Sequence, residues 1–200
     1  MRGIVDTVVF KPVDWFAPLK WEDTFALAQP VEIDVGCGKG AFLLWAARTR
    51  PQSNFLGIER QFARLRKVDK KIQRLGLDNV RLIRVEAGYL IGKLVPADSV
   101  AAYHIFFPDP WPKRRHAAHR LFQPEFVADV HRTLRQGGAV NVATDDPTYF
   151  LQIQSLMKRV GQFDEVAPER LPEEAMTEFE RVFRQKGQPI FRSRYVRQDQ

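Results

Sequence analysis

The sequence predicts an α/β fold whose core is a mostly parallel, doubly wound sheet with helices on both faces. Strand and helix patterns alternate from residue 31 onward, and this order implies crossover connections between parallel strands. The first strand pattern runs directly into a glycine-rich turn and then a helix. With 200 residues, of which 44% are hydrophobic and 28% charged, the chain suits one soluble domain that spans 1–200.

Five short apolar runs bounded by turn residues predict the strands of the sheet, at residues 31–35, 54–58, 80–85, 99–106 and 139–143. Two weaker strand patterns follow in the tail, at 163–166 and 189–196. Residues 1–30 are rich in proline and aromatic side chains, and they predict an irregular lead-in that packs on the domain.

Four segments have the apolar spacing of helices, at residues 39–49, 61–75, 124–134 and 147–160. The second of them carries an apolar row on one side, formed by Phe62, Leu65, Val68, Ile72 and Leu75. Glycine is common just past the end of a helix, so we expect Gly76 to end this helix and Gly137-Gly138 to end the third.

The charge of the chain favours an anionic partner. Its net charge is +7 and its pI is about 9.7, which suits nucleic acid or a membrane surface. The opening residues lack the apolar region of a signal peptide, and no run is apolar and long enough to span a bilayer. Cys37 is the one cysteine, so no internal disulfide can form. We therefore expect a cytoplasmic protein without a membrane segment.

A candidate cofactor site follows the first strand. Gly36, Gly38 and Gly40 form a G-x-G-x-G pattern, and glycines let the backbone turn sharply and approach a ligand closely. Glu59 ends the second strand, 23 residues after Gly36, where a carboxylate can accept both hydroxyls of a ribose. Asp34 can receive a cationic group such as an ammonium. The pattern serves nicotinamide cofactors and S-adenosylmethionine alike, and a tight turn without a ligand also stays open.

The most specific segment is Phe-Pro-Asp-Pro-Trp-Pro-Lys, which runs from Phe107 to Lys113 after the fourth strand. Its three prolines restrict the backbone, which predicts a stiff loop that holds Asp109 and Trp111 over the cofactor cleft. A fixed carboxylate beside a cofactor indicates catalysis, the alternative being a structural loop. The Trp111 ring can stack on a base or fill the core, and Lys113 can pair with a phosphate.

This loop resembles that of the bacterial tRNA (guanine-N7)-methyltransferase family, and the resemblance covers most of the chain. It extends to residues 21–25, 33–40, 57–59, 143–145 and 177–180. The resemblance implies a Rossmann-like class I methyltransferase fold, S-adenosyl-L-methionine as cofactor and tRNA as partner. It also implies methylation at N7 of a variable-loop guanine, conventionally position 46, which gives 7-methylguanosine and S-adenosyl-L-homocysteine.

The resemblance also assigns residues to the site. The cofactor and catalytic site is expected to contain Asp34, Gly36, Gly38, Gly40, Glu59, Glu86 and Asp109. The substrate is expected to contact Lys113, Asp145, Thr177 and Glu180. Glu86 stands where the family more often has aspartate, and it either contacts the adenine region or is a solvated loop acid.

The chemistry expected of this site needs no general base, because guanine N7 carries a lone pair and no proton. Positive charge develops on the purine during the reaction, and a fixed carboxylate near the ring stabilises it. We assign this catalytic role to Asp109. Asp145 is expected to accept hydrogen bonds from the N1–H and amino groups of the guanine. The base is expected to leave its stack, since N7 can take part in tertiary pairing.

Two basic stretches can follow a phosphate backbone, although a run of charge is more often a solvated face. The first is a stripe on the predicted helix 61–75, formed by Arg64, Lys67, Lys71 and Arg74. The second is the tail 181–197, which has six basic residues and no acid. No metal is expected, because His116 and His119 make one pair where a zinc site needs three or four ligands.

Three other functions stay open on the sequence alone. A methyltransferase for a protein or small molecule would share the glycine loop but would leave the basic stretches and the 177–180 motif without a role. A nicotinamide-dependent oxidoreductase is opposed by the shortened glycine pattern. A non-catalytic RNA-binding protein is opposed by the stiff Asp109 loop above the cofactor loop. No feature of the sequence indicates an obligate protein partner.

Overall fold

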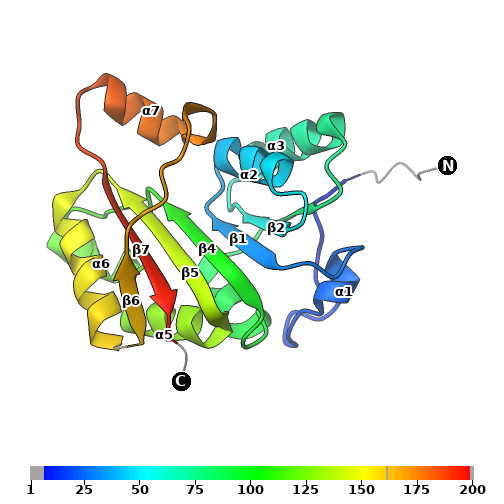
Figure 1. Cartoon of the computed structure of the whole chain (residues 1–200), viewed down its shortest axis with the longest axis horizontal. Helices are drawn as coiled ribbons and strands as arrows, with labels where there is room; N and C mark the ends of the chain where they lie inside the picture. The colour runs from blue at the N-terminus through cyan, green and yellow to red at the C-terminus, as the bar shows by residue number, and fades with distance from the viewer. Residues whose placement is uncertain (1–6, 161, 199–200) are drawn as a thin grey trace.

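The computed structural model describes residues 7–160 and 162–198, and a seven-stranded sheet forms its centre (Figure 1). The strand order is β3-β2-β1-β4-β5-β7-β6. The strands are β1 (Val31–Val35), β2 (Asn54–Ile58), β3 (Val80–Ile83), β4 (Val100–Phe106), β5 (Leu134–Thr144), β6 (Phe163–Val166) and β7 (Phe191–Arg197). The pairs among β1 to β5 are parallel, whereas β7 runs antiparallel to β5 and β6. The predicted mostly parallel, doubly wound sheet is confirmed.

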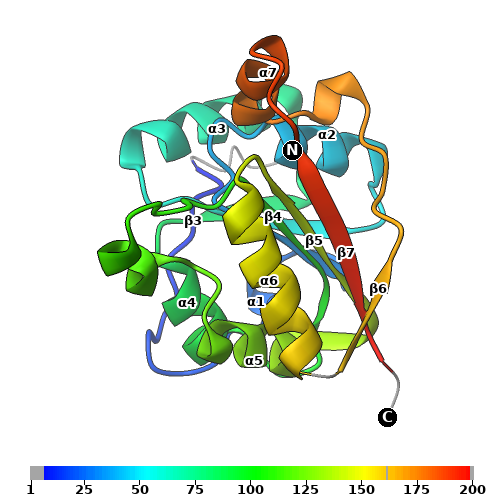
Figure 2. The same ribbon diagram turned by 90° about the vertical axis from the view of Figure 1, so that its left-hand side faces the viewer.

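Helices cover both faces of the sheet (Figures 1 and 2). One face packs against α2 (Ala41–Thr49) and α3 (Phe62–Leu75). The other packs against α4 (Ala87–Tyr89), the π-helical turn η1 (Leu90–Leu94), α5 (Pro124–Thr133) and α6 (Pro147–Val160). Within the described residues, no helix combines the length and the apolar character that crossing a membrane requires.

Side chains alternate between the two faces along each strand and so build two apolar clusters. Ile33 and Val35 of β1 join the cluster beneath α5 and α6, and Phe55 of β2 joins the one beneath α2 and α3. On α3, the middle of the predicted apolar row is buried, and Gly76 ends the helix with a φ of +64°. The amphipathic pattern therefore placed this helix with its buried side correctly.

The predicted boundary between the third helix and the fifth strand is wrong. We expected Gly137-Gly138 to end the third helix, but α5 already ends at Thr133 and β5 begins at the next residue. Gly137 has a φ of +66°, and the β4–β5 register shifts between Val100 and Ala102. A left-handed residue inside a strand marks a bulge or similar irregularity. The two glycines therefore interrupt a strand ladder instead of ending a helix.

The lead-in pairs with the outer edge of the sheet. It contains the short helix α1 (Trp21–Thr24) and a single parallel bridge between Val9 and Leu82 of β3. Leu82 N donates to Val8 O at 3.0 Å, and Phe10 N donates to Leu82 O at 2.9 Å. Because β3 is the edge strand, this segment shields its unpaired backbone groups. Residues 1–6 of the predicted lead-in lie outside the described residues.

Besides α1, α4 and η1, three more short helical elements lie outside the predicted helices. They are η2 (Arg114–His119) after β4, and η3 (Glu173–Ala175) and α7 (Glu178–Gln185) between β6 and β7. Thr177 Oγ1 accepts a hydrogen bond from Glu180 N at 3.2 Å and so caps the start of α7. Threonine followed three residues later by glutamate is a helix-start signal. That signal lies inside the 177–180 motif, for which the family resemblance implies a substrate contact.

Candidate active site

The candidate site lies at one edge of the sheet, where the parallel strands β1 to β5 end. Ligands of open α/β sheets bind outside the carboxyl ends of the strands. The glycine loop follows β1, Glu59 follows β2, and the proline loop follows β4. Helix α7 lies over this same edge, next to α2 (Figure 1). Segments far apart in the sequence are thus brought to one end of the molecule.

The glycine loop adopts a backbone that needs glycine at three positions. The φ angle is +74° at Gly36, +56° at Gly38 and +78° at Gly40, in the left-handed region that other residues rarely enter. Cys37 N donates to Ile58 O at 2.9 Å, and Gly40 N donates to Cys37 O at 2.8 Å. The first bond holds the turn against the end of β2, and the second closes the turn itself.

The space around these glycines shows where a ligand fits. A Cβ at Gly36 would meet no atom within 4 Å, and one at Gly38 would meet only Gly36 O, at 3.8 Å. A Cβ at Gly40 would instead lie 2.8 Å from Val68 Cγ1. Gly36 and Gly38 therefore border open space, where a nucleoside or amino-acid group can approach the backbone, whereas Gly40 is packed against α3.

Alanine substitutions at two of these positions are expected to separate stability from ligand binding. Gly40→Ala should destabilise the fold by about 2–5 kcal/mol, because the overlap of the new methyl group with Val68 adds to the strain of a left-handed alanine. Gly36→Ala meets no neighbour, costs about 1–2 kcal/mol of backbone strain, and points its methyl group into the open space. Urea unfolding and calorimetric titration with S-adenosyl-L-methionine measure the two effects. Unchanged cofactor affinity in Gly36→Ala would exclude Gly36 from the site.

Two carboxyl groups lie beneath the loop. Glu59 is 6% exposed and accepts hydrogen bonds from Gly38 N at 3.1 Å and Gln61 N at 2.7 Å. Asp34 is 4% exposed, and burial together with the negative charge of Glu59 raises its pKa to about 8. Within residues 7–160 and 162–198, the Asp34 carboxyl has no hydrogen-bond or ion-pair partner. Such a group is a candidate to receive a cationic ligand.

Glu86 is the N-cap residue that precedes α4, and it is exposed. Its carboxylate accepts a hydrogen bond from Tyr89 N at 2.8 Å, so it caps the helix. The Tyr89 hydroxyl in turn donates to Trp15 O at 2.6 Å, which ties the lead-in to this corner. The structure therefore gives Glu86 a capping contact, and its contact with the cofactor stays a prediction.

The proline loop is anchored by Arg120, which lies outside the predicted site residues. Arg120 Nε donates to Pro110 O at 2.7 Å, and Nη2 donates to Trp111 O at 3.3 Å. The guanidinium also bonds to Gln152 and lies 5.1 Å from the centroid of the Tyr149 ring. No local sequence pattern marks a cation ten residues away as the anchor of a loop. The loop is therefore held by a tertiary contact as well as by its prolines.

The two aspartates expected to contact the guanine leave neighbouring strands at this edge. Asp109 is exposed, and its carboxylate has no hydrogen-bond or ion-pair partner in the described part of the chain. Asp145 is half-buried directly after β5. Phe107 N donates to Ala143 O at 2.7 Å, which ties the start of the proline loop to the end of β5. Lys113, farther along the loop, is exposed.

Trp111 does not fill the core, because it is 37% exposed. Its ring centroid lies 5.7 Å from that of His116 and 5.1 Å from that of His119. The φ angle of Trp111 is +42°, an uncommon conformation of the kind that gathers at functional sites. The two histidines support the exposed Trp111 ring.

The described residues include no group of three or more His, Cys, Asp or Glu side chains that could hold a metal ion.

Helix α7 is bound to the sheet through Glu180, which is 1% exposed. Its carboxylate pairs with Arg184 Nη2 at 2.9 Å and with Arg192 of β7. Phe183 of α7 contacts Phe107 of the proline loop, with ring centroids 5.6 Å apart. The substrate residues predicted on this segment thus cap and anchor α7 beside the proline loop, and their contact with substrate stays a prediction.

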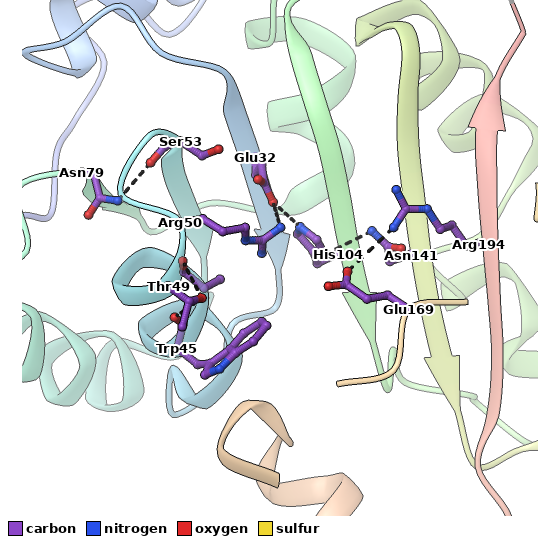
Figure 3. A network of polar contacts seen from close by, with 11 residues as sticks. Glu32, Trp45, Thr49, Arg50, Ser53, Asn79, His104, Asn141, Glu169 and Arg194 are labelled. Carbon is purple, nitrogen blue, oxygen red and sulfur yellow. Dashed lines mark hydrogen bonds and ion pairs between the residues drawn. The ribbon is translucent and has the colours of Figure 1, made fainter. Parts of the chain in front are cut away.

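A buried polar network crosses the sheet from β1 through β4 to β5, and Arg50 joins it from the end of α2 (Figure 3). Glu32 accepts from Arg50 Nη1 at 2.9 Å and lies 2.8 Å from His104 Nε2, while Asn141 Nδ2 lies 3.3 Å from His104 Nδ1. Burial lowers the pKa of His104, so a neutral ring donates to Glu32 and accepts from Asn141. Burial acts to raise the pKa of Glu32, but His104 and the charge of Arg50 outweigh it and lower that pKa.

Comparison with known sequences identifies the relatives of this chain. A family model described as a putative methyltransferase matches residues 28–193. The tRNA (guanine-N(7)-)-methyltransferase of Chlamydia caviae is 32% identical over 202 residues, which cover 97% of this chain and 90% of that protein. The protein of the same name from Thermotoga maritima is also 32% identical, over 175 residues that cover 87% of this chain and 56% of that protein.

Comparison with solved structures identifies the fold. The 16S rRNA methyltransferase KamB has a TM-score of 0.67 at 17% identity, over 90% of this chain and 93% of that one. The chain therefore has the Rossmann-like class I methyltransferase fold. Because both the family model and the Chlamydia relative match over most of its length, the chain belongs to the tRNA (guanine-N(7)-)-methyltransferase family.

Proposed function

We propose that this chain methylates N7 of a guanine at position 46 in the tRNA variable loop, giving 7-methylguanosine and S-adenosyl-L-homocysteine. The observation that carries the proposal is the anchored Asp109 loop at the same sheet edge as the open glycine loop, in a chain of this family. We propose tRNA as the macromolecular partner, the cytoplasm as the location, and no obligate protein partner.

The cofactor is S-adenosyl-L-methionine, which supplies an electrophilic methyl group on a sulfonium sulfur. Its site comprises Asp34, Gly36, Gly38, Gly40, Glu59, Glu86 and Asp109. Asp34 receives the ammonium group, because it is a buried carboxyl without a partner in the described residues. Glu59 accepts the ribose hydroxyls with the lone pairs that the two backbone amides leave free.

The guanine lies between the proline loop and α7. Asp109 stabilises the positive charge that develops on the purine, and Asp145 accepts from the guanine N1–H and amino groups. Lys113 pairs with a phosphate. Thr177 can donate its hydroxyl proton to the substrate, because its oxygen accepts from the backbone. Glu180 acts through α7, since its carboxylate already has two arginine partners.

The raised pKa of Asp34 predicts that cofactor binding releases a proton. An ammonium group favours the ionised carboxylate, whereas the free protein holds the pKa near 8. Cofactor affinity should therefore rise with pH below about 8, by up to about tenfold per pH unit, and then level off. Because this pKa lies above its unfolded value, the same group makes the ligand-free fold less stable as pH rises toward 8.

Calorimetric titration in buffers of different ionisation enthalpy measures the released proton directly. Asp34→Asn serves as the matched variant, since it keeps the size of the side chain and removes its titration. Asp34→Asn should bind the cofactor more weakly, and its cofactor affinity should not change with pH. An affinity that is independent of pH in the unaltered protein would contradict the assignment of Asp34 to the ammonium group.

The proposed reaction is tested by methyl transfer from radiolabelled S-adenosyl-L-methionine to unmodified tRNA transcripts. Two transcripts are compared, with guanine and with adenine at the variable-loop position. We expect label on the guanine transcript alone, released by chemistry that cleaves at 7-methylguanosine. Label on neither transcript, with cofactor binding intact, would reject tRNA N7 methylation and leave the fold assignment unchanged.

A further inference from the structure

The two basic stretches of the chain differ in how the fold uses their charges. In the tail, four arginines have acidic partners, namely Arg184, Arg192, Arg194 and Arg197. On α3, the side chains of Arg64, Lys67 and Arg74 form no hydrogen bond or ion pair with any described residue. Cations that the fold has already paired are less available to a polyanion. The α3 stripe therefore has more charge to offer than the tail.

The α3 stripe meets the candidate site at the glycine loop. Lys71 Nζ donates to Lys39 O at 3.0 Å, and Lys39 stands between two of the loop glycines. The ammonium group of Lys39 pairs in turn with Glu178, the first residue of α7. Helix α3, the cofactor loop and α7 therefore meet at a single polar cluster beside the site.

Glu178 pairs directly with Lys39, and the charges of Arg64 and Lys71 act on it from α3. The hydrogen bond from Lys39 lowers the pKa of Glu178, and the charges of Lys39, Arg64 and Lys71 act in the same direction. The Lys39 and Glu178 side chains are 52% and 55% exposed, so their ion pair is readily exchanged for another anion. Three positive groups and one negative group leave a surplus of two positive charges at this point.

We propose that Lys39, Arg64 and Lys71 form a binding site for a backbone phosphate of the tRNA, and that Glu178 occupies it in the free protein. The inference rests on the proposed function, because it takes tRNA as the ligand. A phosphate offers several acceptor oxygens to ammonium and guanidinium groups at once, more than one carboxylate does. Because Glu178 begins α7, the arriving phosphate also releases the tie between α7 and the glycine loop.

Arg64→Ala tests the site without altering the glycine loop. We expect weaker binding of an unmodified tRNA transcript, and a slope of log affinity against log salt that is smaller by about one. Fluorescence anisotropy between about 50 and 200 mM salt measures both quantities. Lys158→Ala is the matched control, because it removes one positive charge from the last turn of α6, on the opposite face of the sheet. For Lys158→Ala, the slope of log affinity against log salt should equal that of the unaltered protein.

Glu178→Gln tests the second half of the proposal, since it removes the competing charge and keeps the size of the side chain. It should raise tRNA affinity by about threefold at low salt. Glu174→Gln is the matched control, an exposed glutamate of η3 that has no ion-pair partner among the described residues. In the Arg64→Ala background the gain from Glu178→Gln should shrink, because the two side chains act on the same phosphate.

Equal salt slopes for Arg64→Ala and Lys158→Ala would overturn the phosphate site. Equal affinities for the two Glu→Gln variants would overturn the role of Glu178. Failure of the proposed function is distinguishable from both results. If the unaltered protein labels no tRNA, the proposed methylation is rejected. If Arg64→Ala nevertheless reduces the slope of log affinity against log salt, the phosphate site is still supported.

Discussion

Asp109→Ala is expected to lower the rate of methyl transfer by about 10²–10³-fold, while cofactor and tRNA still bind. The reason is that the carboxylate stabilises charge that exists only in the transition state, so its loss affects the chemical step more than binding. The fold should be unaffected, because Asp109 is exposed and its carboxylate has no partner within the described residues. Single-turnover rates with both substrates saturating isolate this effect from binding.

Two further variants sharpen this prediction. Asp109→Asn keeps the shape and removes the charge, so an electrostatic role predicts a loss close to that of alanine. Asp23→Ala makes the same substitution at an exposed residue of α1 and should leave the rate unchanged. Full turnover by Asp109→Ala, with the protein folded, would remove Asp109 from the mechanism.

Arg50→Met is expected to destabilise the fold by about 3 kcal/mol at neutral pH, which lowers Tm by roughly 10 °C. Glu32 is 6% exposed, and the substitution removes the cation that its buried carboxylate pairs with, leaving neutral His104 beside it. The guanidinium also lies over the rings of Phe42, Trp45 and Phe55, and methionine replaces part of that packing. Urea unfolding measures the loss.

The pH dependence distinguishes charge from packing in this variant. In the unaltered protein the pKa of Glu32 is lowered, so the group contributes stability above its unfolded pKa and loses it as pH falls. Without Arg50, burial favours the protonated carboxyl of Glu32. The difference in free energy of unfolding between the unaltered protein and Arg50→Met should therefore become smaller as pH falls toward about 4.5. Arg48→Met, an exposed change in the last turn of α2, two residues before Arg50, should cost less than about 0.5 kcal/mol at either pH. Equal costs for both substitutions would show that the network adds no stability.

Local patterns predicted the regular elements well. The bounds of β1, β2 and β6 agree with the predicted ranges residue for residue, and α3 starts one residue later than predicted. These elements follow from apolar spacing and flanking turn residues, which act over a few neighbours. The same reasoning failed at Gly137, because a glycine with positive φ is compatible with both a helix end and a strand bulge. The pairing of β5 with β4 and β7 decides between them.

Function followed from a different kind of local signal. The glycine spacing and the proline loop each lie within a few residues, and each acid directly follows or ends a strand pattern, so the sequence alone indicates the family. The roles of individual side chains did not follow in the same way. Glu180 has a sequence position that the family assigns to substrate, yet its carboxylate is held by Arg184 and by Arg192 of another element.

By itself, then, the sequence determined the fold class, the order of the strands along the chain, the cofactor loop and the family. Only the tertiary structure decided that Arg120 anchors the proline loop and that α7 sits over the strand ends beside it. It also decided that the tail arginines are paired while Arg64 is left available. The physical reason is that these features depend on contacts between elements distant in the chain, whereas periodicity and turn chemistry report only on neighbours.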